Sequence, residues 1–244
     1  MTVDSSRPVK QIVAAMPWSA RIFEEFGIDF CCEGNLSVEE ACRRAGRSLD
    51  EIIRKLDEVR SADHATEWDT ASLSALMRHI VEKHHTFCRQ ELTRLGALFA
   101  EALRAQAREC PEIAKLQKCF AKMSSELLMH LGKEEQTLFP MIEKMEQAAA
   151  CQQTLPRLPF GTIQNPIGMM VFEHDETGVD LTQMRELSMG FKMPPDADRS
   201  LQALYEGLKA FEIDMHEHVF LENYVLFPRT AAIEKQAAKT SAAS

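Results

Sequence analysis

The chain has 244 residues, 45% of them hydrophobic, and a formal net charge of −9. This length allows a substantial buried core, while the acidic balance argues against nucleic acid as the main partner, because phosphate binding needs a basic surface. The sequence contains no apolar run long enough to span a bilayer and no signal-peptide segment within residues 1–21. We therefore expect a cytoplasmic protein without membrane contact.

Short helices are predicted in the first 60 residues. Pro17 is suited to the first turn of a helix and Gly27 to its end, so residues 18–26 are predicted to be helical. Ser37 and Ser48 are each followed three residues later by a glutamate, the capping box of a helix start. Two further short helices are therefore expected, ending near residues 46 and 60.

A cysteine pair, Cys31-Cys32, lies in a glycine-bounded segment that is predicted to be a loop. Buried thiols are often simple packing residues, but neighbouring cysteines form a disulfide only in a strained ring and suit redox change or soft-metal handling better. We interpret this pair as functional. The seven cysteines include no CxxC pair, which favours a reducing compartment. The remaining five are interpreted as structural: Cys42, Cys88, Cys110, Cys119 and Cys151.

Four long helices are predicted after a polar linker at residues 61–70. Their apolar residues recur every three or four positions, which is typical of buried helical faces. The first should cover residues 72–108, with Val81 on its inward face, and the second should begin near Pro111, with Met141 facing inward. The third should begin near Pro166. The expected domains are residues 1–60, a bundle at 71–235 and a disordered tail at 236–244.

The two halves of the predicted bundle share a repeat. His130 and Glu134 are followed by Leu-Phe-Pro, and His218 and Glu222 are followed by the same three residues. A histidine and a glutamate four residues apart lie on one face of a helix and can point toward one ion. The repeat therefore predicts two metal-ligand helices.

A further histidine precedes each pair at a similar distance, His85 by 45 residues in the first half and His174 by 44 in the second. Each half then reads as two antiparallel helices carrying two histidines and one glutamate. Ionised carboxylates and imidazoles in a bundle core cost several kcal/mol unless a cation compensates them. The pattern predicts an all-α, antiparallel four-helix bundle with a dinuclear carboxylate-histidine site.

Other polar groups and two prolines lie near these motifs, and we exclude His216 and His64 from the ligand set. His84 adjoins His85, and periodicity does not separate the two, although the spacing slightly favours His85. His216 should face solvent or another element, and His64 belongs to the linker. We interpret three carboxylates, Glu135, Glu173 and Glu217, as exposed charges, with a supporting role near the site as the alternative for Glu173. Pro140 and Pro228 are expected to kink or end their helices.

Taken together, these motifs resemble the family of di-iron proteins that repair iron-sulfur centres after nitrosative or oxidative stress. In that family a small cysteine-bearing domain precedes a hemerythrin-like bundle. The resemblance covers nearly the whole chain. It is carried by the segment from Ala20 to Gly34 and by bundle motifs at residues 82–85, 130–142, 173–178 and 218–229.

The resemblance implies that His85, His130, His174 and His218 ligate two iron ions while Glu134 and Glu222 bridge them. The family usually has an aromatic residue where His84 stands, which supports His85 and leaves a ligand exchange open. The six-ligand set argues against simple oxygen transport. It leaves each ion short of six ligands, so an oxo or hydroxo bridge and an exchangeable position are expected.

The leading functional hypothesis is donation of iron to damaged iron-sulfur proteins, with Cys31 and Cys32 receiving or relaying it. The alternatives are reduction of nitric oxide at the di-iron site and sensing of nitric oxide or oxygen. The sequence leaves open which proteins are repaired, the electron donor, iron versus manganese, and whether the chain forms a homodimer.

Overall fold

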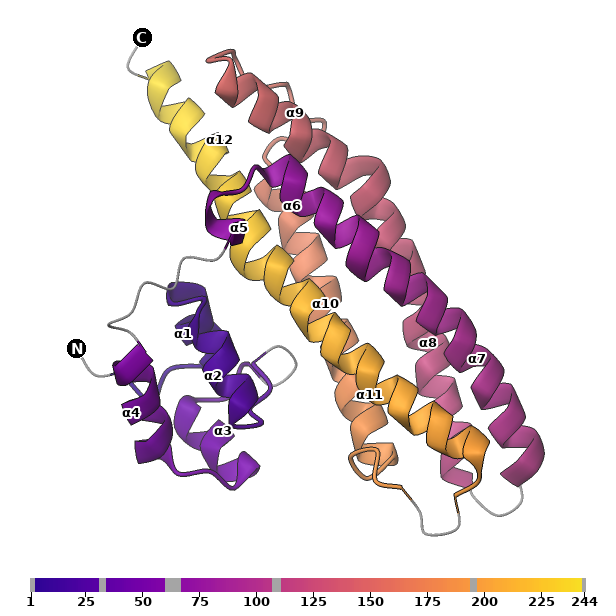
Figure 1. The fold of residues 1–244 in the computed structure, drawn as a ribbon. Helices are drawn as coiled ribbons and strands as arrows, with labels where there is room; N and C mark the ends of the chain where they lie inside the picture. Colours follow the sequence, from indigo (N-terminus) through magenta and orange to yellow (C-terminus); the bar gives the residue numbers. More distant parts are fainter. Residues whose placement is uncertain (1–2, 31–33, 60–66, 107–110, 194–196, 243–244) are drawn as a thin grey trace.

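The computed structural model describes residues 3–30, 34–59, 67–106, 111–193 and 197–242. Four long helical rods form an antiparallel bundle, which confirms the predicted fold class (Figure 1). The rods comprise α6 (Leu73–His79), η1 (Ile80–His85) and α7 (Thr86–Gln106); α8 (Pro111–Lys133), η2 (Glu134–Leu138) and α9 (Phe139–Ala150); α10 (Gln164–Leu187); and α11 (Arg199–Phe220), η3 (Leu221–Leu226) and α12 (Phe227–Ala242). Within the bundle, α7 packs against α8 and α11, and α8 packs against α10.

The small N-terminal part consists of four short helices: α1 (Val9–Ala15), α2 (Ser19–Glu25), α3 (Val38–Ala45) and α4 (Leu49–Val59). The hydroxyl of Ser37 accepts a hydrogen bond from the Glu40 amide, and that of Ser48 accepts one from the Glu51 amide, as the capping pattern predicts. Helix α1 is an addition to the predicted elements. A further short helix, α5 (Glu67–Thr70), lies within the expected linker.

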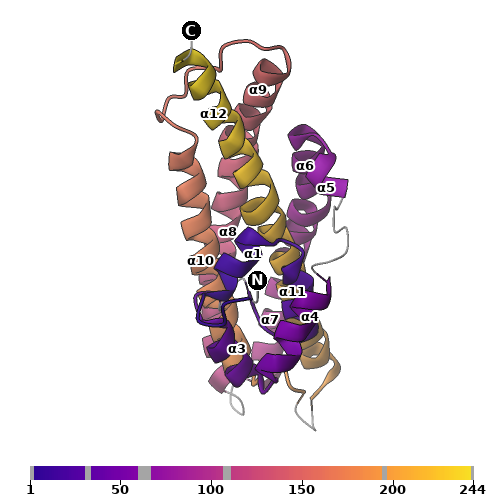
Figure 2. The ribbon, with the colours of Figure 1, turned by 90° about the vertical axis from the view of Figure 1, so that its left-hand side faces the viewer.

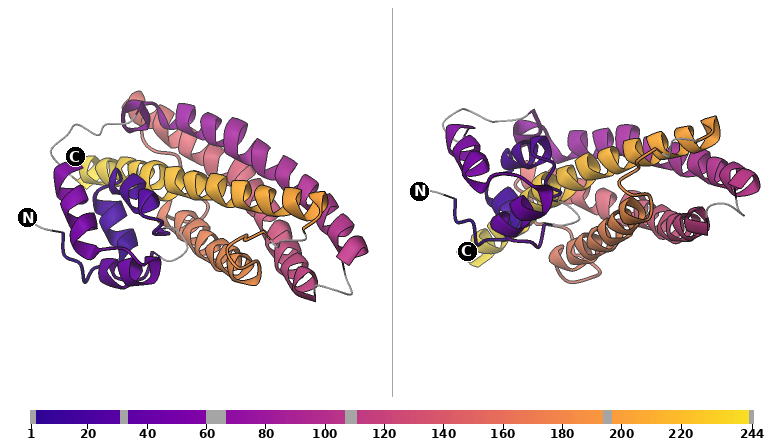
Figure 3. Two further views of the ribbon diagram at one scale, coloured as in Figure 1. Left: turned by 60° about the horizontal axis from the view of Figure 1, so that its bottom comes forward. Right: turned by 90° about the horizontal axis from the view of Figure 1, so that it is seen from below.

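This small domain lies against the face of the bundle formed by α10 and α11, as Figures 2 and 3 show from three directions. Asp29, in the chain after α2, lies 3.3 Å from His216 of α11 and 3.9 Å from Arg185 of α10. Phe30 makes edge contacts with the rings of Phe220 and Tyr224. The segment that leads into the cysteine pair is therefore anchored on the fourth rod.

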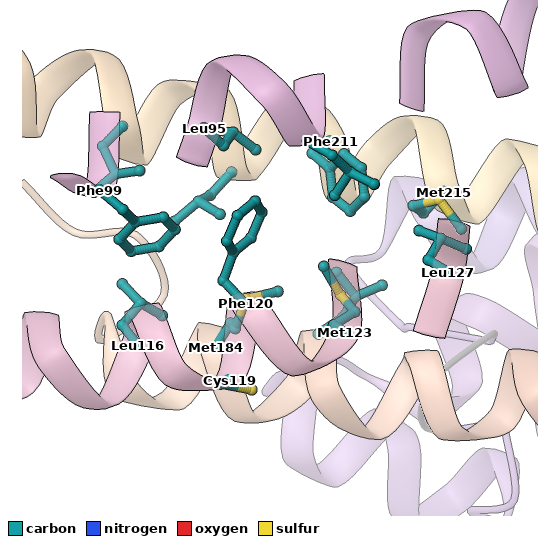
Figure 4. Packing of buried hydrophobic residues seen from close by; sticks show 14 of the residues in the cluster. Leu95, Phe99, Leu116, Cys119, Phe120, Met123, Leu127, Met184, Phe211 and Met215 are labelled. Atoms are coloured by element: carbon teal, nitrogen blue, oxygen red, sulfur yellow. The ribbon is translucent and has the colours of Figure 1, made fainter. Parts of the chain in front are cut away.

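Two apolar clusters fill the bundle and leave a polar layer between them. The first cluster lies in the lower part of Figure 1, and Figure 4 shows some of its side chains, which interdigitate between α7, α8, α10 and α11. The second cluster lies toward the top of Figure 1 and includes Leu76 of α6 and Ile142 of α9. Between the clusters the inward positions of all four rods are polar and buried: His84, His85, His130, Glu134, His174, His218 and Glu222. The apolar layers on both sides fix the polar layer at one level.

Three rods contain a π-helical turn at this level: η1, η2 and η3. The Phe139 amide donates to the Glu134 carbonyl, and the Phe227 amide donates to the Glu222 carbonyl, each five residues back. Pro140 and Pro228 follow directly, and the helices continue through them as α9 and α12. These prolines were expected to kink or end their helices. They do not end them, because the wider turn before each makes room for the proline ring.

The π turns also shift the buried face by about one residue relative to a 3.6-residue repeat. Ile80 is fully buried where Val81 was expected to face inward, and Ile142 takes the place expected for Met141. In η1 the wider turn buries both His84 and His85. A strictly regular helix pattern could not predict these positions.

The C-terminal segment differs from its prediction. Residues 236–242 were expected to be a disordered tail, but α12 runs to Ala242. Residues 236–242 include three alanines, one lysine and one glutamine, which are strong helix formers, and they extend a helix that is already nucleated. Among the described helices, none combines the length and the apolar character needed to cross a membrane.

Candidate metal centre

Six buried side chains converge in the polar layer as two overlapping groups. Cluster 1 contains His85 of η1 and His218 of α11, and cluster 2 contains His130 of α8 and His174 of α10. Glu134 and Glu222 belong to both clusters, and within each cluster the potential ligand atoms all lie within 4.8 Å of one another. The structure therefore brings together all six side chains that the sequence analysis selected.

Each shared glutamate turns one oxygen toward each cluster. Glu134 Oε2 lies 3.5 Å from His85 Nε2, and its Oε1 lies 3.3 Å from His130 Nε2. Glu222 Oε1 lies 3.1 Å from His218 Nε2, and its Oε2 lies 3.1 Å from His174 Nε2. Each carboxylate therefore faces both histidine pairs.

The polar atoms of the layer fit cations better than they fit one another. Both oxygens of Glu134, Glu222 Oε2 and His85 Nε2 are buried without a hydrogen-bond partner, although nitrogen and oxygen atoms approach closely. His130 Nε2 and His174 Nε2 are 3.0 Å apart. Neighbouring ligands about 2.1 Å from an octahedral ion are separated by about 3 Å, so these nitrogens suit one shared ion. Nitrogen and carboxylate ligands together suit first-row divalent metals.

An outer set of acceptors orients three of the four histidines. His85 Nδ1 donates to Glu135 at 2.7 Å, His130 Nδ1 donates to Glu173 at 2.9 Å, and His174 Nδ1 donates to the Asn223 side-chain oxygen at 2.9 Å. Such bonds fix the ring orientation and leave Nε2 for the metal.

These contacts change the interpretation of two carboxylates. Glu135 was interpreted as an exposed charge, but it accepts from His85. For Glu173 the contact with His130 favours the alternative, a supporting role near the site. The two carboxylates also form ion pairs with basic side chains. Glu135 pairs with the Arg89 guanidinium, and Glu173 pairs with the Lys133 ammonium. Both glutamates are adjacent in sequence to a ligand, Glu134 or His174, which was the signal available to find them.

The buried carboxylates raise the pKa values of two histidines of the layer. Burial by itself would lower the pKa of His130, but the charges of Glu134, Glu222 and Glu173 outweigh it and raise that pKa to about 9. The pKa of His85 is also raised, since nearby carboxylates again outweigh burial. The raised pKa values show that the buried carboxylates favour positive charge at this level of the bundle.

Burial shifts the pKa of a third histidine of the layer and of two thiols in the neighbouring apolar cluster. Complete burial lowers the pKa of His218 and so favours the neutral imidazole, the form that can ligate a metal. Burial raises the pKa of the Cys88 thiol to about 12 and that of the Cys119 thiol to about 11. These thiols stay protonated, in accord with the structural role expected for them.

The structure separates the two adjacent histidines of η1. His85 belongs to cluster 1, whereas His84 faces Asp214 of α11, with 3.0 Å between His84 Nδ1 and Asp214 Oδ1. His216 faces the small domain through Asp29, as one of the two expected orientations. Glu217 is half-exposed and pairs with Lys83. Cys31 and Cys32 lie outside the described residues.

The fold and the paired clusters define a hemerythrin-type cation-binding bundle, and comparison with known families agrees. Residues 76–230 match the family described as "Hemerythrin HHE cation binding domain". Residues 5–60 match a separate family described as a "Domain of Unknown function (DUF542)". The first match covers the bundle and the second covers the small domain.

Curated relatives resemble the chain over almost its whole length. A "Probable iron-sulfur cluster repair protein" of Haemophilus influenzae is 32% identical over 92% of this chain and 96% of its own length. A protein of Pectobacterium atrosepticum named "Iron-sulfur cluster repair protein YtfE" is 31% identical over 90% of this chain and 94% of its own length. A protein of the same name from Escherichia coli is 30% identical over 93% of this chain and 98% of its own length. The chain belongs to this family of iron-sulfur cluster repair proteins, which confirms the resemblance seen in the sequence.

Proposed function

We propose that this protein holds two iron ions in clusters 1 and 2 and donates iron to iron-sulfur proteins damaged by nitrosative or oxidative stress. The observation that carries the proposal is the placement of Glu134 and Glu222, whose oxygens divide between two histidine pairs in a buried layer. His85, His130, His174 and His218 complete the proposed ligand set. The bound pair would supply Lewis-acid and one-electron chemistry.

The residues of the chain have distinct tasks in this proposal. The four imidazoles provide neutral nitrogen ligands, and Glu135, Glu173 and Asn223 orient three of them. Each cluster offers two nitrogens and one oxygen from each glutamate. Four donors are fewer than the six that iron commonly accepts, so room remains for an oxo or hydroxo bridge and for a small external ligand.

We also propose that Cys31 and Cys32 receive or relay the iron. Support comes from the residues on either side of them. Phe30 packs against Phe220 and Tyr224, on both sides of Glu222 in the chain. A Cβ on Gly34 would collide with the Phe30 carbonyl oxygen, so these two described residues, on either side of the cysteine segment, approach closely. We propose a cytoplasmic location as well, because the described cysteines, such as Cys151, are free thiols.

The first test is transfer of isotopically labelled iron. The reduced, loaded protein is mixed without oxygen with a dehydratase whose cluster has been damaged, and label and recovered activity are measured in the dehydratase. The proposal expects both to rise together. Cys31→Ser/Cys32→Ser should reduce transfer, while Cys151→Ser, at an exposed free thiol, serves as the matched control.

Retention of the label without recovery would contradict iron donation. Nitric oxide reduction is the second candidate, favoured by the four-donor clusters with room for an external ligand. Formation of nitrous oxide over many turnovers would support it. Tight binding of nitric oxide or oxygen without turnover or iron release would instead indicate a sensor. Metal analysis of the purified protein distinguishes iron from manganese.

A further inference from the structure

A third group of potential ligands lies beside cluster 1. It contains His84 of η1 with Asp214 and Glu217 of α11, and its ligand atoms also lie within 4.8 Å of one another. We call this group cluster 3. His84 is brought into the interior by the π turn η1, which also places His85 in cluster 1. The two clusters therefore draw on consecutive residues of one turn.

Two polar atoms of cluster 3 are buried without a partner. His84 is fully buried, and its Nε2 has no hydrogen-bond partner. Asp214 uses Oδ1 to face His84 Nδ1, while its Oδ2 is buried and unpartnered. A buried acceptor without a partner destabilises the fold, so Asp214 Oδ2 suits a cation that would satisfy it.

Cluster 3 extends from the core to the surface, and the exposed fraction of its side chains rises in that direction. The His84 ring stacks on the ring of His218, a residue of cluster 1, with 5.7 Å between centroids and an interplanar angle of 9°. The His84 side chain is 0% exposed, that of Asp214 is 14% exposed, and that of Glu217 is 51% exposed. An ion held here would be in reach of solvent on one side and next to cluster 1 on the other.

We propose that cluster 3 is a third cation site, through which a divalent transition metal enters or leaves cluster 1. One neutral imidazole and two carboxylates balance the charge of a divalent ion and match the ligand preference of Fe²⁺ or Mn²⁺. The Lys83 ammonium, 2.9 Å from Glu217, occupies the outer end in the metal-free protein. An entering cation replaces it and takes over its charge interaction.

This inference deepens the proposed function and rests on it, because a transfer site is useful only beside a metal centre that exchanges ions. The test loads the full chain anaerobically with Fe²⁺ to fill the two shared clusters, then adds Mn²⁺ and follows the unbound Mn²⁺ by electron paramagnetic resonance. Mn²⁺ binds nitrogen and oxygen sites more weakly than Fe²⁺, so it does not displace the iron.

We expect the loaded protein to bind about one Mn²⁺ per chain, and Asp214→Asn or Glu217→Gln to abolish that binding. Both variants should load iron several-fold more slowly and still reach the same final iron content. Glu206→Gln, at an exposed position on the same helix, is the matched control and should behave as the natural protein does.

A nitrogen coupling in the spectrum of the bound Mn²⁺ that is lost in His84→Gln would identify the imidazole ligand. The inference is overturned if the iron-loaded protein binds no Mn²⁺, or if Asp214→Asn and Glu217→Gln retain it. Failure of the proposed function is distinct, since the chain would then not take up iron in the shared clusters at all. Binding of Mn²⁺ that depends on Asp214 would still establish cluster 3 in that case.

Discussion

Clusters 1 and 2 have the same kinds of ligand but different surroundings. In cluster 2 both imidazoles donate from Nδ1, His130 to Glu173 and His174 to Asn223. In cluster 1 only His85 has such an acceptor, while His218 Nδ1 is buried without a partner and its ring is stacked by His84. Since these outer bonds hold a ligand in place, cluster 1 should exchange its ion more readily.

The largest effect is expected where the two clusters are joined. Glu222→Gln replaces a carboxylate that faces both histidine pairs with a neutral amide, which bridges cations poorly. Bound iron should fall to less than half of its original amount, with loss from both clusters. Metal analysis and Mössbauer spectroscopy measure this. Glu126→Gln, at an exposed carboxylate of α8, is the control. Retention of one full ion per chain would show that Glu222 serves a single cluster.

A smaller and one-sided effect is expected for Glu173→Gln. The amide keeps the shape of the side chain but removes the charge that supports His130, so affinity at cluster 2 should fall about 10- to 100-fold. Competition with a chelator of known affinity measures the loss. Glu176→Gln, at an exposed position on the same helix, provides the control. An equal loss at both clusters would contradict the separate roles of their outer acceptors.

The difference between the clusters should also appear as two phases of iron release. We expect cluster 1 to empty first when a chelator is added, and stopped-flow absorbance should resolve the phases. Asn223→Leu removes the acceptor of His174 at similar volume, so it should accelerate the slow phase several-fold and leave the fast one unchanged. Gln202→Leu, an exposed amide of α11, tests for general destabilisation. If only the fast phase accelerated, the fast phase would belong to cluster 2 and the slow phase to cluster 1.

The smallest effect concerns protons at cluster 2. The pKa of His130 is raised to about 9 in the metal-free protein, and metal requires the neutral imidazole. Metal binding near neutral pH should therefore release a proton from His130, and apparent affinity should rise with pH until about 9. Isothermal titration in buffers of different ionisation enthalpy counts the released protons. A binding enthalpy that is the same in every buffer would contradict the release of a proton from His130.

The same shift predicts the sign of a stability effect. Because the pKa of His130 is higher in the folded, metal-free protein than the usual value of 6.5, its protonation stabilises that state. The contribution is fully present below pH 6.5 and disappears as the pH rises through about 9. Thermal unfolding of the metal-free protein across this interval, with His130→Gln as the comparison, tests the sign.

The sequence by itself determined the helical class and the six converging residues. Apolar residues at spacings of three and four define the rods, and His130-x3-Glu134 and its repeat mark polar groups that interrupt apolar faces. These are local periodic signals, so they survive without knowledge of the tertiary structure. The capping of α3 by Ser37 is similarly local.

Only the tertiary structure decided how these residues combine. The repeat suggested two histidines and one glutamate in each half, but each cluster takes one histidine from each half, because α7 lies beside α11 and α8 lies beside α10. The π turn η1 gave His84 and His85 separate environments, and contacts between rods placed Glu135 and Glu173 beside His85 and His130. Such pairings depend on neighbours distant in sequence, and no helical period encodes them.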